Sequence, residues 1–451
     1  MKPAVTRAAR IDAATGGIRL IRLGAHFRQL AGARVWLSPA GQLAAYLGLF
    51  LVVAYFKTPR LFKDPRFWAE DGAAYYKDCL GQTFSTCLQI VHGGSYQLLE
   101  NLMVYVAARL PIITAPAVTM YLSLAVHLVV VSQIVQFTRA YRLPVAVTAL
   151  LVLAWALLPA TYEVWLSATN VQWVAGVSVV WVLVMPNEWL VRHRKGILAW
   201  CAVSGLSGVP GVLLAPVFLL RSLVERSRTI LAIALVLAGC AVFQLAILAQ
   251  VGTSGERSLA SHDAITLITP FFLQTVLSPI LSVDFATALG QALAVQRISP
   301  GTLPFGILLA GLGVMTVAVA VAWSGLRNHL VALTVGAWVL LTLVQSFGGL
   351  GRPEIFLSGW GGARYFLAGS VCLCILLAWG TRGPVRALRI LASGLMACIV
   401  LCGAVQAKFS SWQAGMLTGP SWRHQIRTCP VGKPCRVMVW GGADWVFDIV
   451  K

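Results

Sequence analysis

Two adjacent carboxylates, Glu70 and Asp71, are the clearest candidates for chemistry in this sequence. They belong to the block Phe67-Trp68-Ala69-Glu70-Asp71-Gly72, which follows the first long apolar run, in a chain with only 15 acidic residues among 451. A carboxylate at this position can accept the proton of an incoming hydroxyl group as a general base. The structural alternative is an acid pair at a helix N-terminus, where the helix dipole favours negative charge. We expect the pair to be catalytic.

A second polar block surrounds Arg364, at the start of a later apolar run. It contains Arg352, Trp360, the pair Gly361-Gly362 and Tyr365. A guanidinium fork can hold a phosphate group through two parallel hydrogen bonds, and glycine lets a ligand approach the backbone closely. The alternative is an arginine that extends its charge from an apolar surface into water. We expect Arg364 to bind phosphate.

A third polar segment lies between two apolar runs and carries Glu163, Asn170 and Gln172 next to Trp165 and Trp173. Carboxamides can hydrogen-bond sugar hydroxyls, and indole rings can stack on sugar faces. An interfacial tryptophan belt with a capped turn explains the same pattern equally well. Both interpretations stay open at this point.

The elements that must position these residues are apolar helices. Hydrophobic residues make up 58% of the chain and charged residues 11%, whereas soluble domains have about 25% charged residues. Runs of roughly 18 or more apolar residues are long enough to cross a bilayer as helices. The sequence therefore predicts an all-α polytopic membrane protein. The expected spans are 40–56, 112–137, 144–160, 171–185, 229–251, 304–324, 329–347, 365–380 and 388–405.

One further apolar segment, 196–220, has basic residues on both sides and helix breakers at its centre, 204–211. We expect two short helices that form a hairpin within the membrane, whose apex is buried in protein or lines a cavity. This hairpin brings the total to about eleven transmembrane or intramembrane helices. The expected domains are a basic cytoplasmic arm at 1–39, a membrane domain at 40–405 and a short outer tail at 406–451.

Charge supports this orientation. The net charge of +20 is spread over the loops between spans, which argues against a nucleic-acid partner. With the basic arm placed inside by the positive-inside rule, three acids (Asp12, Glu188 and Glu225) lie on the cytoplasmic side, and the remaining twelve of the 15 lie on the outer side. We therefore expect the chemistry on the outer face.

The ten cysteines divide into two classes. Six lie within the apolar runs and are expected to pack there. The other four form two close pairs in outer segments, Cys79 with Cys87 and Cys429 with Cys435, and predict two local disulfides in an oxidising compartment. Their spacings match no zinc module.

The first outer loop, 57–111, is expected to hold two interfacial helices. The first is predicted from Trp68 to Tyr76. The second is an amphipathic segment, 96–110, with one apolar face formed by Leu98, Leu99, Leu102, Met103 and Val106. His92 lies between the helices and is a weaker candidate for contact with an acceptor. In the tail, 436–440 is predicted as a strand, and the tail is expected to pack on this loop.

Together these features resemble the GT-C superfamily of integral-membrane glycosyltransferases. The resemblance rests on the block 67–72, the block Gly361-Gly362-Ala363-Arg364-Tyr365 and the topology, and it covers most of residues 40–440. Many relatives have aspartate before glutamate, whereas this chain has Glu70 before Asp71, so which acid is the base stays open. Because the predicted outer tail has only about 45 residues, we do not expect it to form the soluble domain that some relatives carry.

The resemblance implies an inverting transfer of a sugar from a polyprenyl-phosphate donor to a cell-envelope glycan or glycolipid. The implied location is the periplasmic face of a bacterial inner membrane. Glu70 or Asp71 would be the base, and Arg364, with Arg352 and Tyr365, would bind the donor phosphate. The sugar and acceptor contacts would come from Trp68, Tyr75, His92, Glu163, Asn170, Gln172 and Trp360. Similar enzymes often need no metal, although an acid pair such as this one could also bind a divalent metal ion.

Two other functions remain as alternatives. A flippase for a lipid-linked sugar would also need aromatic residues and an arginine, but it predicts inverted repeats and charges near the membrane centre. A membrane acyltransferase predicts an essential histidine or serine in a recognisable motif. The sequence contains no repeat and no such motif.

Overall fold

The computed structural model describes residues 38–251, 269–296, 303–325, 329–348, 356, 362–409, 419–439 and 445–450. The chain divides into two units, Met1–Ala45 and Tyr46–Lys451, and the contacts below lie within the second. Most of the basic arm predicted at 1–39 lies outside the described residues.

The described chain is mainly helical, as predicted. Five of its helical segments are long and apolar enough to cross a membrane. They are α2 (Pro39–Lys57), α7 (Ala115–Ala140), α14 (Arg228–Val251), α21 (Arg386–Phe409) and the segment Ala363–Gly380, which joins η5 (Ala363–Phe366) to α20 (Leu367–Gly380). The other predicted spans are also helical, but their length and composition do not establish eleven crossings.

Further helices complete the bundle. They are α8 (Val145–Leu157), η2 (Pro159–Thr161), α9 (Val171–Val184), α10 (Asn187–Arg192), η3 (Leu273–Leu277), α16 (Ser278–Leu281), α17 (Val283–Gln296), α18 (Leu303–Gly325) and α19 (His329–Gly348). Every residue of α20 is buried, and most of α9 is too. A helix that is apolar all round is stable only when other helices surround it, so α9 and α20 form the centre of the bundle.

The predicted hairpin is present. It consists of α11 (Arg194–Leu206), the single turn α12 (Val209–Val212) and α13 (Ala215–Glu225), and all three pack on α14. The chain breaks at Gly208, whose φ of 150° disfavours residues with a side chain. A Cβ atom there would lie 2.2 Å from the Gln172 side chain. The apex of the hairpin therefore packs closely against the start of α9.

The first loop contains α3 (Pro59–Lys63), η1 (Asp71–Tyr76), α4 (Lys77–Cys79), α5 (Phe84–Leu88), β1 (Val91–His92), β2 (Ser95–Tyr96) and α6 (Leu98–Ala108). The predicted disulfide Cys79–Cys87 joins α4 to α5. The two predicted interfacial helices correspond to η1 and α6 and lie close to their predicted positions. The short hairpin of β1 and β2 turns at Gly93 and Gly94, which both have positive φ.

The buried face predicted for α6 is wrong in detail. Its buried residues are Glu100, Asn101, Met103, Val104 and Ala107, whereas Val106 is 43% exposed. The polar pair can face inward because each side chain has a backbone partner. Asn101 donates hydrogen bonds to the carbonyls of Leu88 and Ile90, and Glu100 accepts one from the amide of Gln172.

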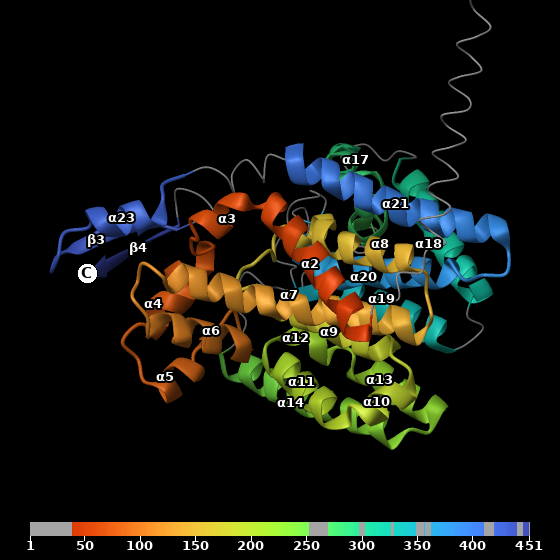
Figure 1. Cartoon of the computed structure of the whole chain (residues 1–451), viewed down its shortest axis with the longest axis horizontal. Coiled ribbons are helices and arrows are strands. Elements are labelled where there is room, and N and C mark those ends of the chain that lie inside the picture. Colours follow the sequence, from red (N-terminus) through yellow and green to blue (C-terminus); the bar gives the residue numbers. More distant parts are fainter. Residues whose placement is uncertain are drawn as a thin grey trace, which may run out of the picture. The chain divides into compact units, whose positions relative to one another are not determined.

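The tail folds against the first loop, as predicted (Figure 1). It contains α23 (Trp422–Thr428), β3 (Pro434–Met438) and β4 (Val446–Val450). The strands pair antiparallel from Pro434 opposite Val450 to Met438 opposite Val446, and the predicted disulfide Cys429–Cys435 links α23 to β3. The predicted strand thus begins two residues early, and its partner β4 was not predicted. Residue 440 lies outside the described part.

Candidate active site

Three segments far apart in the sequence meet at one end of α9. They are the start of η1, the 158–170 connection between α8 and α9, and η5. Asp71, at the start of η1, is hydrogen-bonded to the 158–170 connection. Glu163 of that connection pairs with Arg364 of η5. Each segment contains one of the three predicted polar blocks, so the structure brings these blocks together.

Asp71 is fixed in place. Its side chain is 2% exposed and accepts hydrogen bonds from the Ser167 hydroxyl at 3.1 Å, the Ala168 amide at 3.1 Å and the Thr169 amide at 2.7 Å. The Thr169 hydroxyl donates a fourth. Burial raises the pKa of Asp71 to about 6, against the lowering effect of these donors. A carboxylate with four donors holds the connection in place but has little capacity left for a substrate proton.

Glu70, by contrast, is half-buried, and its side chain makes no hydrogen bond or ion pair with the residues that the structure describes. Its charge acts on Asp71, on Tyr75 and on Arg364. Of the acid pair, Glu70 therefore has the carboxylate that an acceptor hydroxyl can approach.

Arg364 is held by the connection between α8 and α9. Its Nη1 lies 3.2 Å from Oε1 of Glu163 and 3.4 Å from Oδ1 of Asn170. Its backbone amide donates to Oε2 of Glu163 at 3.0 Å. The Asn170 side chain in turn donates to the Glu163 carbonyl at 2.9 Å. Both of these side-chain contacts use Nη1, one corner of a fork with five donors. The guanidinium also interacts with Tyr365, whose ring centroid lies 5.4 Å from Cζ, and the side chain remains 28% exposed.

A sharp turn and an aromatic pair position η5. Gly362, immediately before it, has a left-handed φ of 66°, and a Cβ atom there would lie 2.4 Å from the Phe356 ring. The group that approaches the backbone at Gly362 is thus the Phe356 ring, whereas the sequence predicted a ligand at the glycine pair. The Tyr365 ring meets the Trp173 ring edge-on at 4.8 Å between centroids, which links η5 to α9.

The structure buries several residues that were predicted to touch sugar. Trp68 is 9% exposed, Tyr75 4% and Asn170 1%, so they form walls of the site. Tyr75 donates a hydrogen bond to Gln97 and packs its ring 3.9 Å from that of His92.

The partly exposed candidates are Glu163, Gln172 and His92. Gln172 donates to the Thr169 carbonyl at 3.3 Å, so it braces the same connection that Asp71 holds. His92 lies 3.9 Å from Asp78, and burial lowers its pKa while Asp78 raises it. Arg352 and Trp360 lie outside the described residues.

Glu100 and Lys57 support the site but were not singled out in the sequence. Glu100 is fully buried, and burial raises its pKa well above the usual range. Lys57, at the end of α2, donates to the Ala156 carbonyl and the Thr161 hydroxyl, each at 2.9 Å. The signal for Glu100 was its spacing, because it falls three, four and seven positions before Met103, Val104 and Ala107.

The described residues include no group of three or more histidine, cysteine or acidic side chains arranged to hold a metal ion. The acid pair does not fit one either, because protein donors occupy both oxygens of Asp71. Within the described part, the acids support proton and hydrogen-bond chemistry.

Comparison with protein-family models, curated proteins and solved structures gives no match. Function must therefore be inferred from the contacts of this chain. The charge of Glu70, a half-buried carboxylate, acts on Arg364, a partly exposed guanidinium.

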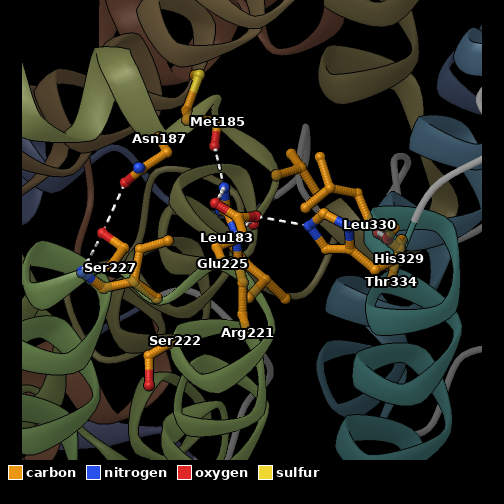
Figure 2. Close-up of polar contacts among 12 residues, drawn as sticks. Leu183, Met185, Asn187, Arg221, Ser222, Glu225, Ser227, His329, Leu330 and Thr334 are labelled. Carbon is orange, nitrogen blue, oxygen red and sulfur yellow. Dashed lines mark hydrogen bonds and ion pairs between the residues drawn. The ribbon is translucent and has the colours of Figure 1, made fainter.

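A second polar cluster lies at the opposite end of α9 (Figure 2). Arg221 is fully buried, pairs with Glu225 at 2.7 Å, and donates to the carbonyls of Leu183 and Met185. Glu225 also contacts His329 at 2.7 Å. A cavity of about 430 Å³ opens here. The guanidinium caps the C-terminus of α9, where cations are favourable, so the cluster joins α9, α13 and α19.

Proposed function

We propose that the chain is a membrane glycosyltransferase of the GT-C type, which moves a sugar from a polyprenyl-phosphate donor to a glycan or glycolipid acceptor with inversion. One observation carries the proposal. The charge of Glu70, the acid of the pair whose side chain has no described partner, acts on Arg364, while Asp71 is held by four donors.

In this proposal Glu70 is the general base. It accepts the proton of the acceptor hydroxyl as the oxygen attacks the anomeric carbon. The bond from that carbon to the phosphate oxygen breaks, and polyprenyl phosphate leaves with the bonding electrons. Because attack comes from the face opposite the leaving group, the configuration inverts.

Arg364 binds the leaving phosphate. Its charge stabilises the negative charge that develops on the phosphate oxygens in the transition state. Glu163 fixes one corner of the guanidinium, so that the remaining donors have a defined direction before the substrate arrives. This preorganisation lowers the cost of orientation during the reaction.

The length of the central helices suits a lipid-borne donor. α8 and α9 have 13 and 14 residues, or about 20 Å at 1.5 Å per residue. The hydrocarbon core of a bilayer is about 30 Å thick. If the bundle spans a membrane, the connection between α8 and α9 therefore begins near or below the level of the lipid headgroups, where a polyprenyl phosphate is found.

We place the site on the periplasmic face of a bacterial inner membrane, with the basic N-terminal arm in the cytoplasm. The support is the charge asymmetry of the sequence under the positive-inside rule and the two disulfides near the site, Cys79–Cys87 and Cys429–Cys435. Disulfides persist in oxidising compartments.

The test is release of polyprenyl phosphate by purified protein in detergent. Candidate polyprenyl-phosphate sugars are supplied with a crude envelope glycan extract, and wild type is compared with Glu70→Gln and Arg364→Ala. The proposal requires acceptor-dependent release that falls at least about 100-fold in Glu70→Gln. If no donor turns over, and labelled lipid-linked sugar instead crosses liposomes with both variants active, the chain is a flippase.

A further inference from the structure

The folded tail has two different faces. Trp422 and Ile426 of α23 are buried against the first loop, together with Phe67 and Tyr76. The Trp422 ring meets the Phe67 ring edge-on at 5.3 Å, and its Nε1 donates to the Ile112 carbonyl at 3.0 Å. The apolar face of the tail is therefore already occupied, next to the block that carries Glu70.

The exposed charged side chains of the folded tail are mostly basic. Arg423 and Arg427 lie four positions apart on α23, so they share one side of the helix. Lys433 and Arg436 lie on either side of Cys435, and the disulfide to Cys429 holds the Cα atoms of the two cysteines 5.6 Å apart. We call this surface the basic tail face; it consists of Arg423, Arg427, Lys433 and Arg436.

The surroundings add to this positive charge. On β4, Asp448 pairs with Arg436 at 3.3 Å, and both side chains remain more than half exposed. In the first loop, the exposed charged side chains are three cations and one acid: Lys63, Lys77, Arg109 and Asp78. Among the described residues of 57–111 and 419–450, exposed cations thus outnumber exposed acids by seven to two.

We propose that the basic tail face binds an anionic glycan, and that the acceptor of the proposed transferase is therefore an acidic polysaccharide or oligosaccharide carrying carboxylate or phosphate groups. The role of this glycan as acceptor rests on the proposed function, whereas its binding to the basic tail face does not. A surface of one sign raises the local concentration of oppositely charged ligands and speeds their arrival. Here that surface is attached directly to the block that contains the base.

The position of the tail favours a glycan over a lipid surface. Figure 1 shows α23, β3 and β4 beyond the ends of α7 and α21, two of the helices long enough to span a membrane. If those helices cross the bilayer, the basic tail face projects into the water beyond it. A lipid-binding surface would need to lie at the level of the headgroups.

The experiment measures binding without any donor. Full-length protein in nanodiscs of zwitterionic lipid is titrated with polygalacturonate, a carboxylated polysaccharide, and with uncharged dextran. The test variant is Arg423→Gln/Arg427→Gln/Lys433→Gln. The matched control is Arg192→Gln/Arg194→Gln/Lys195→Gln, which removes three exposed cations near α10 and α11. All six residues are exposed, so both variants should fold.

We expect polygalacturonate to bind about tenfold more weakly to the test variant, and dextran to bind neither protein. The control should stay within about twofold of wild type. Binding should also weaken as salt rises from about 0.1 M to about 1 M, because the Debye length shortens from about 10 Å to about 3 Å.

Three results would overturn the proposal. One is equal loss of binding in the control, which indicates nonspecific attraction to any basic surface. Another is binding of dextran as tight as that of polygalacturonate. The third is that the wild-type protein binds phosphatidylglycerol vesicles but not polygalacturonate, and that the test variant no longer binds the vesicles. The basic tail face would then be a lipid-binding surface. Because no donor is present, these results are independent of whether Glu70 supports turnover.

Discussion

Replacement of Asp71 by asparagine separates a structural acid from a catalytic one. The substitution keeps the shape of the side chain but turns one acceptor oxygen into a donor nitrogen. If that nitrogen takes the position of Oδ2, it faces the amide of Ala168, now 3.1 Å from Oδ2. In the other orientation it faces the donors at Oδ1, which include the Thr169 amide at 2.7 Å. Each orientation leaves at least one buried donor without an acceptor.

The expected cost follows from these contacts. An unsatisfied buried donor costs about 1–3 kcal/mol. Because burial raises the pKa of Asp71, loss of its charge adds no further cost, and Asp71→Asn should destabilise the protein by about 1–3 kcal/mol. Glu70→Gln removes no described hydrogen bond and should change stability by less than about 0.5 kcal/mol, as surface substitutions usually do.

The assay combines thermal unfolding in detergent, followed by tryptophan fluorescence, with release of polyprenyl phosphate. Asp71→Asn should unfold at a clearly lower temperature, and its turnover should fall only as far as its folded fraction does. Glu70→Gln should unfold like wild type and lose at least about 100-fold in turnover. If Asp71→Asn were as stable as wild type and inactive while Glu70→Gln kept its activity, the roles assigned to the two acids would be reversed.

Three further predictions concern the surroundings of the acids. Glu163→Gln removes the 3.2 Å ion pair that orients Arg364, so KM for the donor should rise several-fold with a smaller change in kcat; an unchanged KM would contradict this positioning role. Gly72→Ala should destabilise the protein by about 1–3 kcal/mol through overpacking, because the added Cβ would lie 2.7 Å from Cγ1 of Val439, and Val439→Ala in the same chain should restore much of the loss in thermal unfolding. The pKa of Asp71 is raised from 3.8 to about 6, so the folded state holds this proton more tightly than the unfolded state does. The resulting stability is present below about pH 4 and is lost as the pH rises through 6. The difference in melting temperature between wild type and Asp71→Asn should therefore change over this pH range, and a constant difference would refute the pKa shift.

Much of the fold follows from local pattern. Apolar runs predict helices because no other open structure satisfies its own backbone in lipid, and each predicted run contains a helix in the described part of the chain. The break in the hairpin followed from glycine and proline. The cysteine pairs followed from their short separations of eight and six residues.

The faces of helices were harder to predict. On α6 the leucines suggested one buried face, but Glu100 and Asn101 are buried. The sequence could not show this, because their partners are backbone groups of Gln172, Leu88 and Ile90. Strand β4 was missed for a related reason, since a strand of five residues is specified mainly by the neighbour with which it pairs.

By itself, the sequence determined that this chain is mainly helical, with helices apolar enough to cross a membrane, and which polar blocks are candidates for its chemistry. Only the tertiary structure distinguished between the two acids of the first block. Neighbouring residues on a helix point in directions about 100° apart. Here the side chain of Asp71 points toward Ser167, Ala168 and Thr169, which lie 96 to 98 residues later in the sequence. Glu70 has no such partner in the described structure, and a contact over that distance depends on the packing of the whole bundle.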